Sequence, residues 1–357
     1  MTDRDDTSSR MNRRDFLVGA SGALVGSGLV AAGWPASGAG ASEQPDLPGA
    51  PQPPNPHPSA AATAFGDLKT GMVQANGLEF HYVEAGSGPL ALCLHGFPDS
   101  PFTYRYLLPA LAGAGYHAVC PYMRGYNPTK IPAQYTNTKT LAADVAGLRK
   151  ALGGDDKGVL IAHDWGSVAA YGAAQLEPSA WRRIVIINIP PLSYDGSIMF
   201  QYPSIKREFY WWFFQMRVSN DVVRLDDFKF IDGIWADWSP GYDAHEDLPH
   251  AKDCVRNPDN LDAALGYYRT FFDPKRFMTP EMIAEQSDTW GKPITQQVLY
   301  MHGSQDGLFP LDKDALERMP ALIGPRASAV MVDGVGHFML VEKPDVVNGH
   351  ILGFVTG

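Results

Sequence analysis

The sequence predicts an α/β protein with a mostly parallel central sheet, helices on its faces and an inserted helical cap. Short apolar runs alternate with helical patterns from about residue 71 onward. The stretch 191–288 breaks this alternation, since it is rich in aromatic residues and contains no convincing buried strand. Charged side chains also stand where several apolar runs end, and catalytic groups gather at the carboxyl ends of parallel strands.

The predicted sheet rests on a series of apolar runs. Residues 78–83 alternate apolar and polar side chains, as a half-buried strand does. Largely apolar, strand-like runs follow at 89–96, 116–125, 158–166, 182–190 and 294–303. Between them, 140–154 has a helical pattern that stops at a Gly pair. Strands that alternate with helices imply right-handed crossovers and a parallel sheet.

These patterns divide the chain into a core and a cap. We assign 65–190 and 289–357 to the α/β core and 191–288 to the helical cap. The aromatic run REFYWWFFQM and the later YYRTFF favour a packed cap over an elaborated loop, because such side chains need a surface to bury against.

Composition excludes several classes of function. With 357 residues, 45% of them hydrophobic, the chain can bury a core of ordinary size. A net charge of -10 argues against a nucleic-acid partner, which requires a basic face. No apolar run after residue 64 is long enough to span a bilayer, so we expect no stable membrane association once the N-terminal signal is removed. The oligomeric state stays open, with a homodimer among the alternatives.

The N-terminus looks like an export signal rather than part of the fold. The residues NRRDFL (12–17) precede a weakly apolar Gly/Ala stretch and resemble a twin-arginine signal. We predict a signal peptide over 1–41, cleaved after Ala41, and therefore a periplasmic or secreted protein. A basic amphipathic terminus or a retained membrane anchor are the alternatives. The Pro/Ala-rich stretch 42–64 is predicted to be an extended linker.

The three cysteines do not suggest a disulfide framework or a thiol site. Cys93 and Cys120 lie in apolar runs, and Cys254 lies in the cap stretch. Their number is odd and their spacing wide. We therefore expect Cys93 and Cys120 to act as small apolar residues.

A charged residue stands where one apolar run becomes an alanine-rich helical pattern. Asp164 follows that run, with the small residues Ala162 and Gly166 on either side. A strand, a tight turn with small neighbours and a helix form a nucleophile elbow, which holds one side chain clear of the sheet. The pattern predicts Asp164 as a nucleophile.

Two downstream residues complete the pattern. Asp306 follows the run 294–303, and His337 stands near the C-terminus. Singly, such an aspartate is often a turn residue, and such a histidine is often a core residue. The order nucleophile, acid, histidine is, however, that of triads built on an elbow. The stretch HGFP (95–98) ends another run, where a second oxyanion donor is expected.

These motifs together resemble a known family. HGFP (95–98), HDWG (163–166), MRGY (123–126), the late Asp306 and GHF (336–338) are similar to the epoxide hydrolase and haloalkane dehalogenase branch of the α/β-hydrolase superfamily. The resemblance covers residues 70–355 and implies an α/β-hydrolase fold. It identifies the chain as an epoxide hydrolase-like member of that superfamily.

The expected chemistry follows from a carboxylate in the place of serine. An ionised Asp164 can displace a leaving group from an sp³ carbon and form an alkyl ester. A water activated by His337, which Asp306 orients, then attacks the ester carbonyl. The backbone N–H groups of Phe97 and Trp165 are expected to hold the oxyanion of this second step.

The resemblance also implies donors for the leaving group. Epoxide hydrolases of this branch use two cap tyrosines to hold the epoxide oxygen. FYWWFFQ matches the first segment and places Tyr210 in that role, and LGYYRTF matches the second and places Tyr268 there, with Tyr267 as the alternative. The expected lining of the pocket consists of aromatic side chains, namely Trp165, Trp211, Trp212 and Phe97. The expected substrates are a small apolar epoxide and water.

Two other functions stay open. Trp165 follows the nucleophile as a halide-binding tryptophan does in dehalogenases, but Phe97 stands where many of those enzymes have Asn. A noncatalytic homologue acting as a binding protein is the second alternative. We expect no metal and no cofactor, because the sequence has no phosphate loop and the histidines of HEDLPH (245–250) fit no common metal spacing. His163 is expected to be a structural hydrogen-bonding residue.

Overall fold

The computed structural model describes residues 66, 68–194 and 199–357, which belong to one compact unit. The export signal over 1–41, its cleavage after Ala41 and the linker over 42–64 lie outside the described residues. They stay predictions. None of the described helices combines the length and the apolar character needed to cross a membrane.

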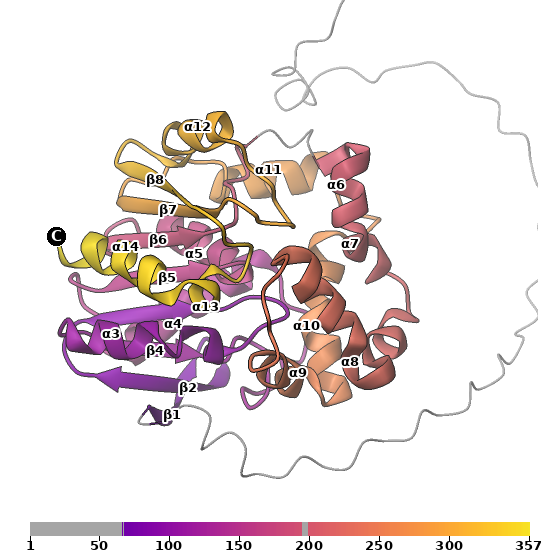
Figure 1. Ribbon diagram of the computed structural model, residues 1–357, viewed down its shortest axis with the longest axis horizontal. Helices are drawn as coiled ribbons and strands as arrows, with labels where there is room; N and C mark the ends of the chain where they lie inside the picture. Colours follow the sequence, from indigo (N-terminus) through magenta and orange to yellow (C-terminus); the bar gives the residue numbers. More distant parts are fainter. Residues whose placement is uncertain (1–65, 67, 195–198) are drawn as a thin grey trace, which may run out of the picture. The chain divides into compact units, whose positions relative to one another are not determined.

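An eight-stranded sheet forms the centre of the core (Figure 1). Its strands lie in the order β1-β2-β4-β3-β5-β6-β7-β8. β1 pairs with β2 and β2 with β4 in antiparallel fashion, and the remaining neighbours are parallel. The bounds are β1 (Lys69–Ala75), β2 (Leu78–Gly86), β3 (Leu90–Leu94), β4 (His117–Pro121), β5 (Val159–His163), β6 (Arg183–Ile187), β7 (Gln297–Gly303) and β8 (Ala327–Val332). The predicted mostly parallel sheet is confirmed.

Helices cover both faces of this sheet. The core helices are η2 (Pro101–Tyr104), α3 (Leu107–Gly113), α4 (Thr138–Ala151), α5 (Trp165–Leu176), α12 (Lys313–Ile323), α13 (Met339–Glu342) and α14 (Pro344–Thr356). Alternate residues of β3 serve opposite faces: Leu92 packs in a cluster with residues of α4 and α5, and Cys93 in one with residues of α3 and α14. A strand covered on both faces is apolar throughout, which is why it reads as one apolar run. Cys93, Cys120 and Cys254 are free and buried.

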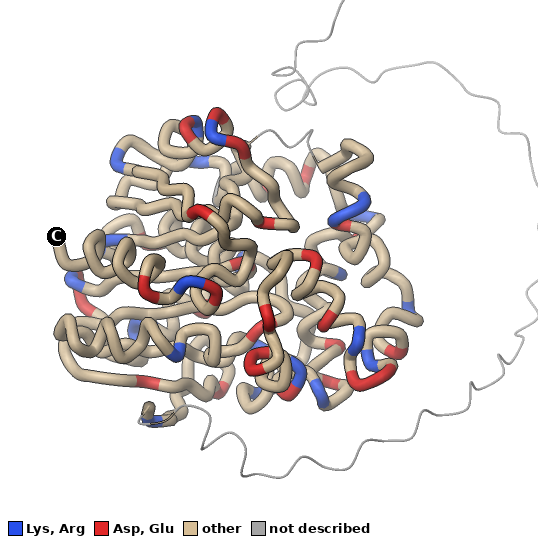
Figure 2. Tube along the Cα trace, viewed as in Figure 1, with Lys and Arg blue, Asp and Glu red and all other residues tan. Residues whose placement is uncertain are grey.

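The cap lies between β6 and β7. Its stretch contains α6 (Tyr202–Arg207), α7 (Phe209–Phe213), α8 (Ser219–Trp238), α9 (Leu248–Val255), α10 (Pro258–Phe271) and α11 (Pro280–Thr289). Acidic and basic residues are interspersed along α8 and α9 (Figure 2). α11 packs against the core helix α5, and Trp290 directly after it donates its indole N–H to the carbonyl of Val168 over 2.8 Å.

Further contacts hold the cap against the core. The Trp235 indole of α8 stacks on Phe338 with ring centroids 3.5 Å apart, and its N–H donates to the carbonyl of Pro98 over 2.8 Å. Arg105, directly after η2, pairs with Asp247 over 2.6 Å. Because Phe338 is the neighbour of His337, the first contact ties the cap directly to the candidate site.

Candidate active site

Asp164 occupies a strained turn between β5 and α5. Its backbone has φ 52° and ψ -123°, a conformation that non-glycine residues rarely adopt and that clusters at functional sites. The turn passes so close to β3 that a Cβ on Gly166 would lie 2.4 Å from the carbonyl oxygen of Leu94. This is the geometry of a nucleophile elbow, and it places the Asp164 side chain beyond the carboxyl end of the sheet.

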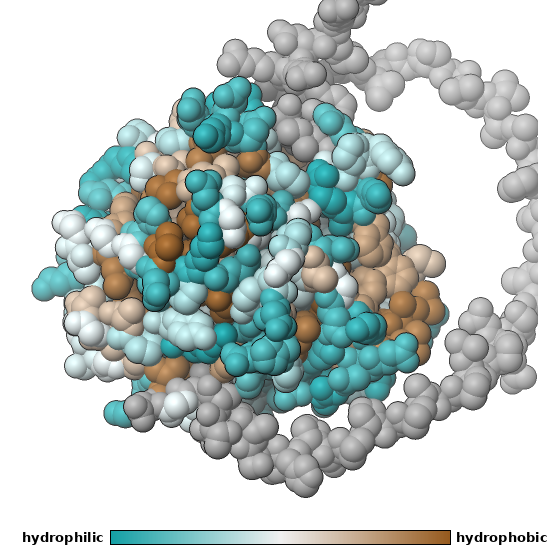
Figure 3. Space-filling model, viewed as in Figure 1, coloured by the Kyte–Doolittle hydropathy of each residue, from teal (hydrophilic) through white to brown (hydrophobic). Residues whose placement is uncertain are grey.

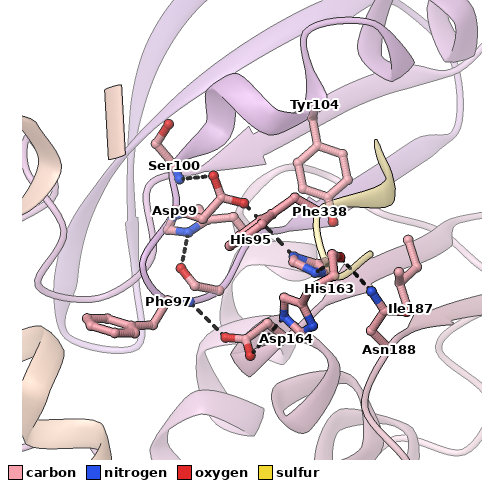
Figure 4. A network of polar contacts seen from close by, with 12 residues as sticks. His95, Phe97, Asp99, Ser100, Tyr104, His163, Asp164, Ile187, Asn188 and Phe338 are labelled. Carbon is pink, nitrogen blue, oxygen red and sulfur yellow. Dashed lines mark hydrogen bonds and ion pairs between the residues drawn. The ribbon is translucent and has the colours of Figure 1, made fainter. Parts of the chain in front are cut away.

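The loop after β3 holds one oxygen of the Asp164 carboxylate. The backbone N–H of Phe97 donates to Oδ1 over 2.8 Å (Figure 4). A Cβ on Gly96 would lie 2.1 Å from that oxygen, so only glycine allows the loop to approach this closely. Burial raises the pKa of Asp164, but the positive charge of the nearby His337 and the hydrogen bond from Phe97 outweigh it, so the pKa lies below its usual value. Asp164 is therefore an ionised carboxylate.

His337 bridges Asp164 and Asp306. Its Nδ1 lies 3.0 Å from Oδ2 of Asp306, and its Nε2 lies 3.5 Å from Oδ2 of Asp164. The other oxygen of Asp306 accepts the backbone N–H groups of Leu308 and Phe309 over 2.8 and 2.9 Å, which fixes the carboxylate. Burial lowers the pKa of His337, but the negative charges of Asp306 and Asp164 raise it to about 10. The structure thus brings the three predicted triad residues together.

The backbone of His337 is also held on both sides. Its N–H donates to the carbonyl of Trp238 over 3.0 Å. Its carbonyl accepts from Nε2 of His163 over 2.9 Å and from the side-chain amide of Asn188 over 2.5 Å. The Trp238 ring meets the imidazole edge-on at 5.0 Å. Sequence reasoning missed Asn188 and Trp238: Asn188 directly follows the apolar core of a run, but nothing in the cap sequence marks Trp238.

A third buried carboxylate, that of Asp99, lies beside His163. Oδ2 of Asp99 is 3.9 Å from Nδ1 of His163 (Figure 4). Burial and the charge of His337 lower the pKa of His163 to about 3, and burial raises that of Asp99 well above its usual value. His163 is therefore neutral and acts through its bond to the His337 carbonyl, as expected of a structural residue. Asp99 was not predicted, although its position two residues after Phe97 in the same loop is a usable signal.

Tyr210 of α7 and Tyr268 of α10 meet within electrostatic reach of Asp164. Their ring centroids are 5.4 Å apart, and the Tyr268 ring lies 5.3 Å from that of Phe97 and 5.1 Å from that of Trp165. Burial raises the pKa of each phenol well above 10, and the negative charge of Asp164 raises it further. Both hydroxyls therefore stay protonated and can donate hydrogen bonds.

Tyr267 points to a different partner. Its hydroxyl donates to the backbone carbonyl of Arg124 over 2.8 Å. This bond ties α10 to the loop after β4 and occupies the donor that an epoxide would need. The geometry thus favours Tyr268 over the alternative Tyr267.

A family model described as "Alpha/beta hydrolase family" matches residues 91–350. The chain belongs to the alpha/beta hydrolase family. An epoxide hydrolase of Caballeronia sordidicola is 30% identical over 321 residues, which cover 81% of this chain and 94% of that protein. Epoxide hydrolase A of Mycobacterium tuberculosis is 27% identical over 323 residues, which cover 80% and 97%. The chain is therefore a hydrolase with epoxide hydrolases among its relatives.

Solved structures show the same fold. The crystal structure of an epoxide hydrolase from Vigna radiata matches this hydrolase with a TM-score of 0.67 at 23% identity. Epoxide hydrolase A of Mycobacterium thermoresistibile matches with 0.65 at 24% identity. Each match covers 81% of this chain and 98% of the other. The predicted α/β-hydrolase fold is confirmed.

The remaining predicted aromatic residues lie at different depths in the hydrolase. Trp165 and Phe97 contact Tyr268 directly, and Trp211 meets Tyr210 edge-on at 6.1 Å. Trp211 also stacks on Phe272 at 4.4 Å. The Trp212 ring packs on the Phe272 ring at 5.8 Å. Trp212 is partly exposed whereas Trp211 is buried, so Trp212 lies nearer the surface of the cap.

The two histidines of the stretch 245–250 make contacts with cap and core residues. His245 is exposed and pairs with Asp243, and His250 packs on Phe102 with centroids 3.8 Å apart. Asp247 between them accepts from Arg105 and Tyr242. Within the described ranges, no group of three or more His, Cys, Asp or Glu side chains could hold a metal ion.

Proposed function

We propose that this hydrolase opens an apolar epoxide to a vicinal diol through an alkyl ester of Asp164. One observation carries the proposal: two protonated phenols, Tyr210 and Tyr268, meet within electrostatic reach of an ionised carboxylate. A nucleophile and paired proton donors are what ring opening needs, because the epoxide oxygen leaves as an alkoxide. The epoxide hydrolases among the relatives support the same reaction.

In the first step, Oδ2 of Asp164 attacks an epoxide carbon in line with the bond that breaks. Oδ1 stays on the N–H of Phe97, so the carboxylate cannot rotate away. The new C–O bond makes an ester, and the ring oxygen takes a proton from Tyr210 or Tyr268. The tyrosinate that forms is reprotonated from solvent.

In the second step, His337 removes a proton from water, and the resulting hydroxide attacks Cγ of the Asp164 ester. Negative charge then develops on Oδ1, which Phe97 already holds. The N–H of Trp165 is a second donor, because the first N–H groups of a helix have no intrahelical partner. Collapse of this intermediate releases the diol and regenerates the carboxylate.

Halide displacement is the second candidate, since Trp165 and Trp211 could supply indole donors. Two contacts favour the epoxide instead. The Trp165 ring packs edge-on against the Tyr268 ring at 5.1 Å, and the Trp211 ring packs edge-on against the Tyr210 ring at 6.1 Å. The two indoles therefore orient the tyrosines.

A substrate panel tests the proposal. We expect turnover of styrene-type and aliphatic epoxides and none of bromoalkanes, measured with the full chain. In a single turnover in ¹⁸O water, the label should enter the Asp164 carboxylate before it enters the diol, because water attacks Cγ of the ester. Label that appears only in the diol would exclude the covalent route, and bromide release would favour the dehalogenase.

The pH dependence of the two steps should differ. The pKa of His337 is raised to about 10 while Asp164 is ionised, and ester formation removes that negative charge, so this pKa falls in the ester. A base must be unprotonated, so ester hydrolysis should accelerate with rising pH and level off below pH 10. The alkylation rate should stay flat from neutral to alkaline pH, since Asp164 is ionised and both phenols are protonated throughout. Rapid-quench mass spectrometry of the alkyl-enzyme separates the two rates; hydrolysis that slows with pH contradicts the assignment of His337.

A further inference from the structure

A buried serine and a partly buried glutamate hold the backbone on both sides of the proposed general base. The N–H of Gly336, before His337, donates to Oε2 of Glu342 over 2.7 Å. The N–H of Phe338, after His337, donates to Oγ of Ser239 over 3.0 Å. Ser239 in turn donates its hydroxyl to Oε1 of Glu342 over 2.6 Å. The two side chains thus form one bridge that spans the catalytic histidine.

This bridge joins the cap to the core. Ser239 directly follows α8 of the cap, whereas Glu342 is the last residue of α13 in the core. Beside Ser239, the carbonyl of Trp238 accepts the N–H groups of His337 and Gly307, each over 3.0 Å. Beyond Ser239 the chain runs to α9 over the surface through hydrophilic residues (Figure 3). The end of α8 is therefore the part of the cap that holds both triad loops.

The end of α8 also lies very close to the histidine loop. A Cβ on Gly336 would lie 2.5 Å from Cα of Ser239, so only glycine allows this approach. The Trp238 ring lies 5.0 Å from that of His337 and 5.4 Å from that of Tyr210. One helix end thus contacts both the base and one of the phenols, and a shift of α8 would displace the two together.

A carboxylate suits the core end of the bridge because it only accepts hydrogen bonds. Glu342 receives an N–H on one oxygen and an O–H on the other, and bonds to a charged acceptor are stronger than those between neutral groups. Glutamine keeps the shape but turns an NH₂ group toward one of these donors. Alanine in place of Ser239 leaves the N–H of Phe338 without its acceptor. Each substitution therefore breaks the bridge at a different atom.

We infer that Ser239 and Glu342 are positioning residues for the hydrolysis of the Asp164 ester. Their hydrogen bonds hold the backbone on both sides of His337 and so fix where Nε2 of its imidazole lies, 3.5 Å from Asp164. The inference rests on the proposed function and deepens it, because it assigns the bridge to the second step alone. The first step uses the carboxylate and the cap phenols.

The test measures the two steps separately in Glu342→Gln and Ser239→Ala. Rapid-quench mass spectrometry of the alkyl-enzyme gives the rates of its formation and of its hydrolysis. Because the Trp238 carbonyl still holds His337, we expect hydrolysis to slow about tenfold, less than the roughly 10²-fold that a displacement of about 1 Å can cost. Alkylation should keep its rate. The double variant should be little slower than either single variant, and Glu342→Asp, which keeps the carboxylate, should recover part of the rate.

Asp247→Asn is the matched control. It breaks the ion pair with Arg105, which is another contact between cap and core, and leaves the histidine loop untouched. This variant should lower the melting temperature and keep both rates. An unchanged hydrolysis rate in Glu342→Gln and Ser239→Ala would overturn the inference. Equal slowing of both steps, or equal slowing of hydrolysis in Asp247→Asn, would reduce the bridge to general stabilisation and would also overturn it.

A measurement without substrate separates this inference from the proposed function. The Nδ1–H of His337 donates to Asp306, and its low-field proton resonance can be assigned by its loss in His337→Gln. Glu342→Gln and Ser239→Ala should shift this resonance or speed its exchange with water, and Asp247→Asn should not. If the unmodified enzyme hydrolyses no epoxide, the proposed function fails and the resonance still reports the position of the imidazole. A resonance that stays the same in all three variants would refute the positioning role.

Discussion

His337→Gln is expected to stop after a single turnover and to leave the enzyme as a covalent ester of Asp164. The first step needs only the carboxylate and the cap phenols, whereas the second needs a base, and glutamine cannot accept a proton from water. General bases contribute up to about 10⁴-fold, so we expect kcat to fall by about 10³-fold. Intact-protein mass spectrometry should show a gain of one substrate mass, located on the peptide that contains Asp164.

Two control variants accompany the His337→Gln measurement. Asp164→Ala combined with His337→Gln should show no adduct, because the nucleophile is absent. His245→Gln removes an exposed cap histidine and should turn over normally. An adduct on another residue, or rapid turnover by His337→Gln, would mean that the base or the nucleophile is assigned wrongly.

Tyr210→Phe combined with Tyr268→Phe is expected to nearly abolish ring opening. Phenylalanine keeps the ring packing with Trp165 and Trp211 and removes only the hydroxyls. Loss of one transition-state donor costs about 10²-fold or more, so each single variant should lose about that much and the double variant more. Single-turnover measurement of the alkyl-enzyme is the suitable readout, since it reports the first step alone.

Tyr267→Phe is the matched control for the tyrosines. Its hydroxyl is engaged by the carbonyl of Arg124, so we expect a loss of about 1 kcal/mol in unfolding free energy and a rate near that of the unmodified enzyme. If Tyr267→Phe abolishes ring opening and Tyr268→Phe does not, Tyr267 is the donor to the epoxide oxygen and the assignment of Tyr268 is wrong. If the double variant keeps full activity, the epoxide oxygen is held elsewhere.

The sheet could be predicted well in its centre and poorly at its edges. β3, β5 and β6 are covered on both faces, so each is a continuous apolar run in the sequence. β1 and β8 were not assigned to strands, because edge strands bury only part of their residues and mix exposed with half-buried positions. Their pairing with β2 and β7 depends on neighbours distant in the chain.

Some residues of the candidate site could also be predicted from the sequence, and others could not. Asp164, Asp306 and His337 could be predicted because a strained turn and the ends of parallel strands leave local signatures, namely small flanking residues and a polar residue after an apolar run. Asn188 and Trp238 left no comparable signature. Both contact the backbone of His337 across long separations in the chain, and such contacts exist only once the sheet and the cap have packed.

The sequence alone determined the fold class and predicted the cap as an insertion and Asp164 as the nucleophile, since each depends on local periodicity or on the chemistry of a single turn. Only the tertiary structure could decide between Tyr267 and Tyr268. The side chains of adjacent helix residues point about 100° apart around the helix axis. The sequence does not show which of the two side chains faces Asp164. Packing of α10 turns Tyr268 toward Phe97 and Trp165 and leaves Tyr267 on the carbonyl of Arg124.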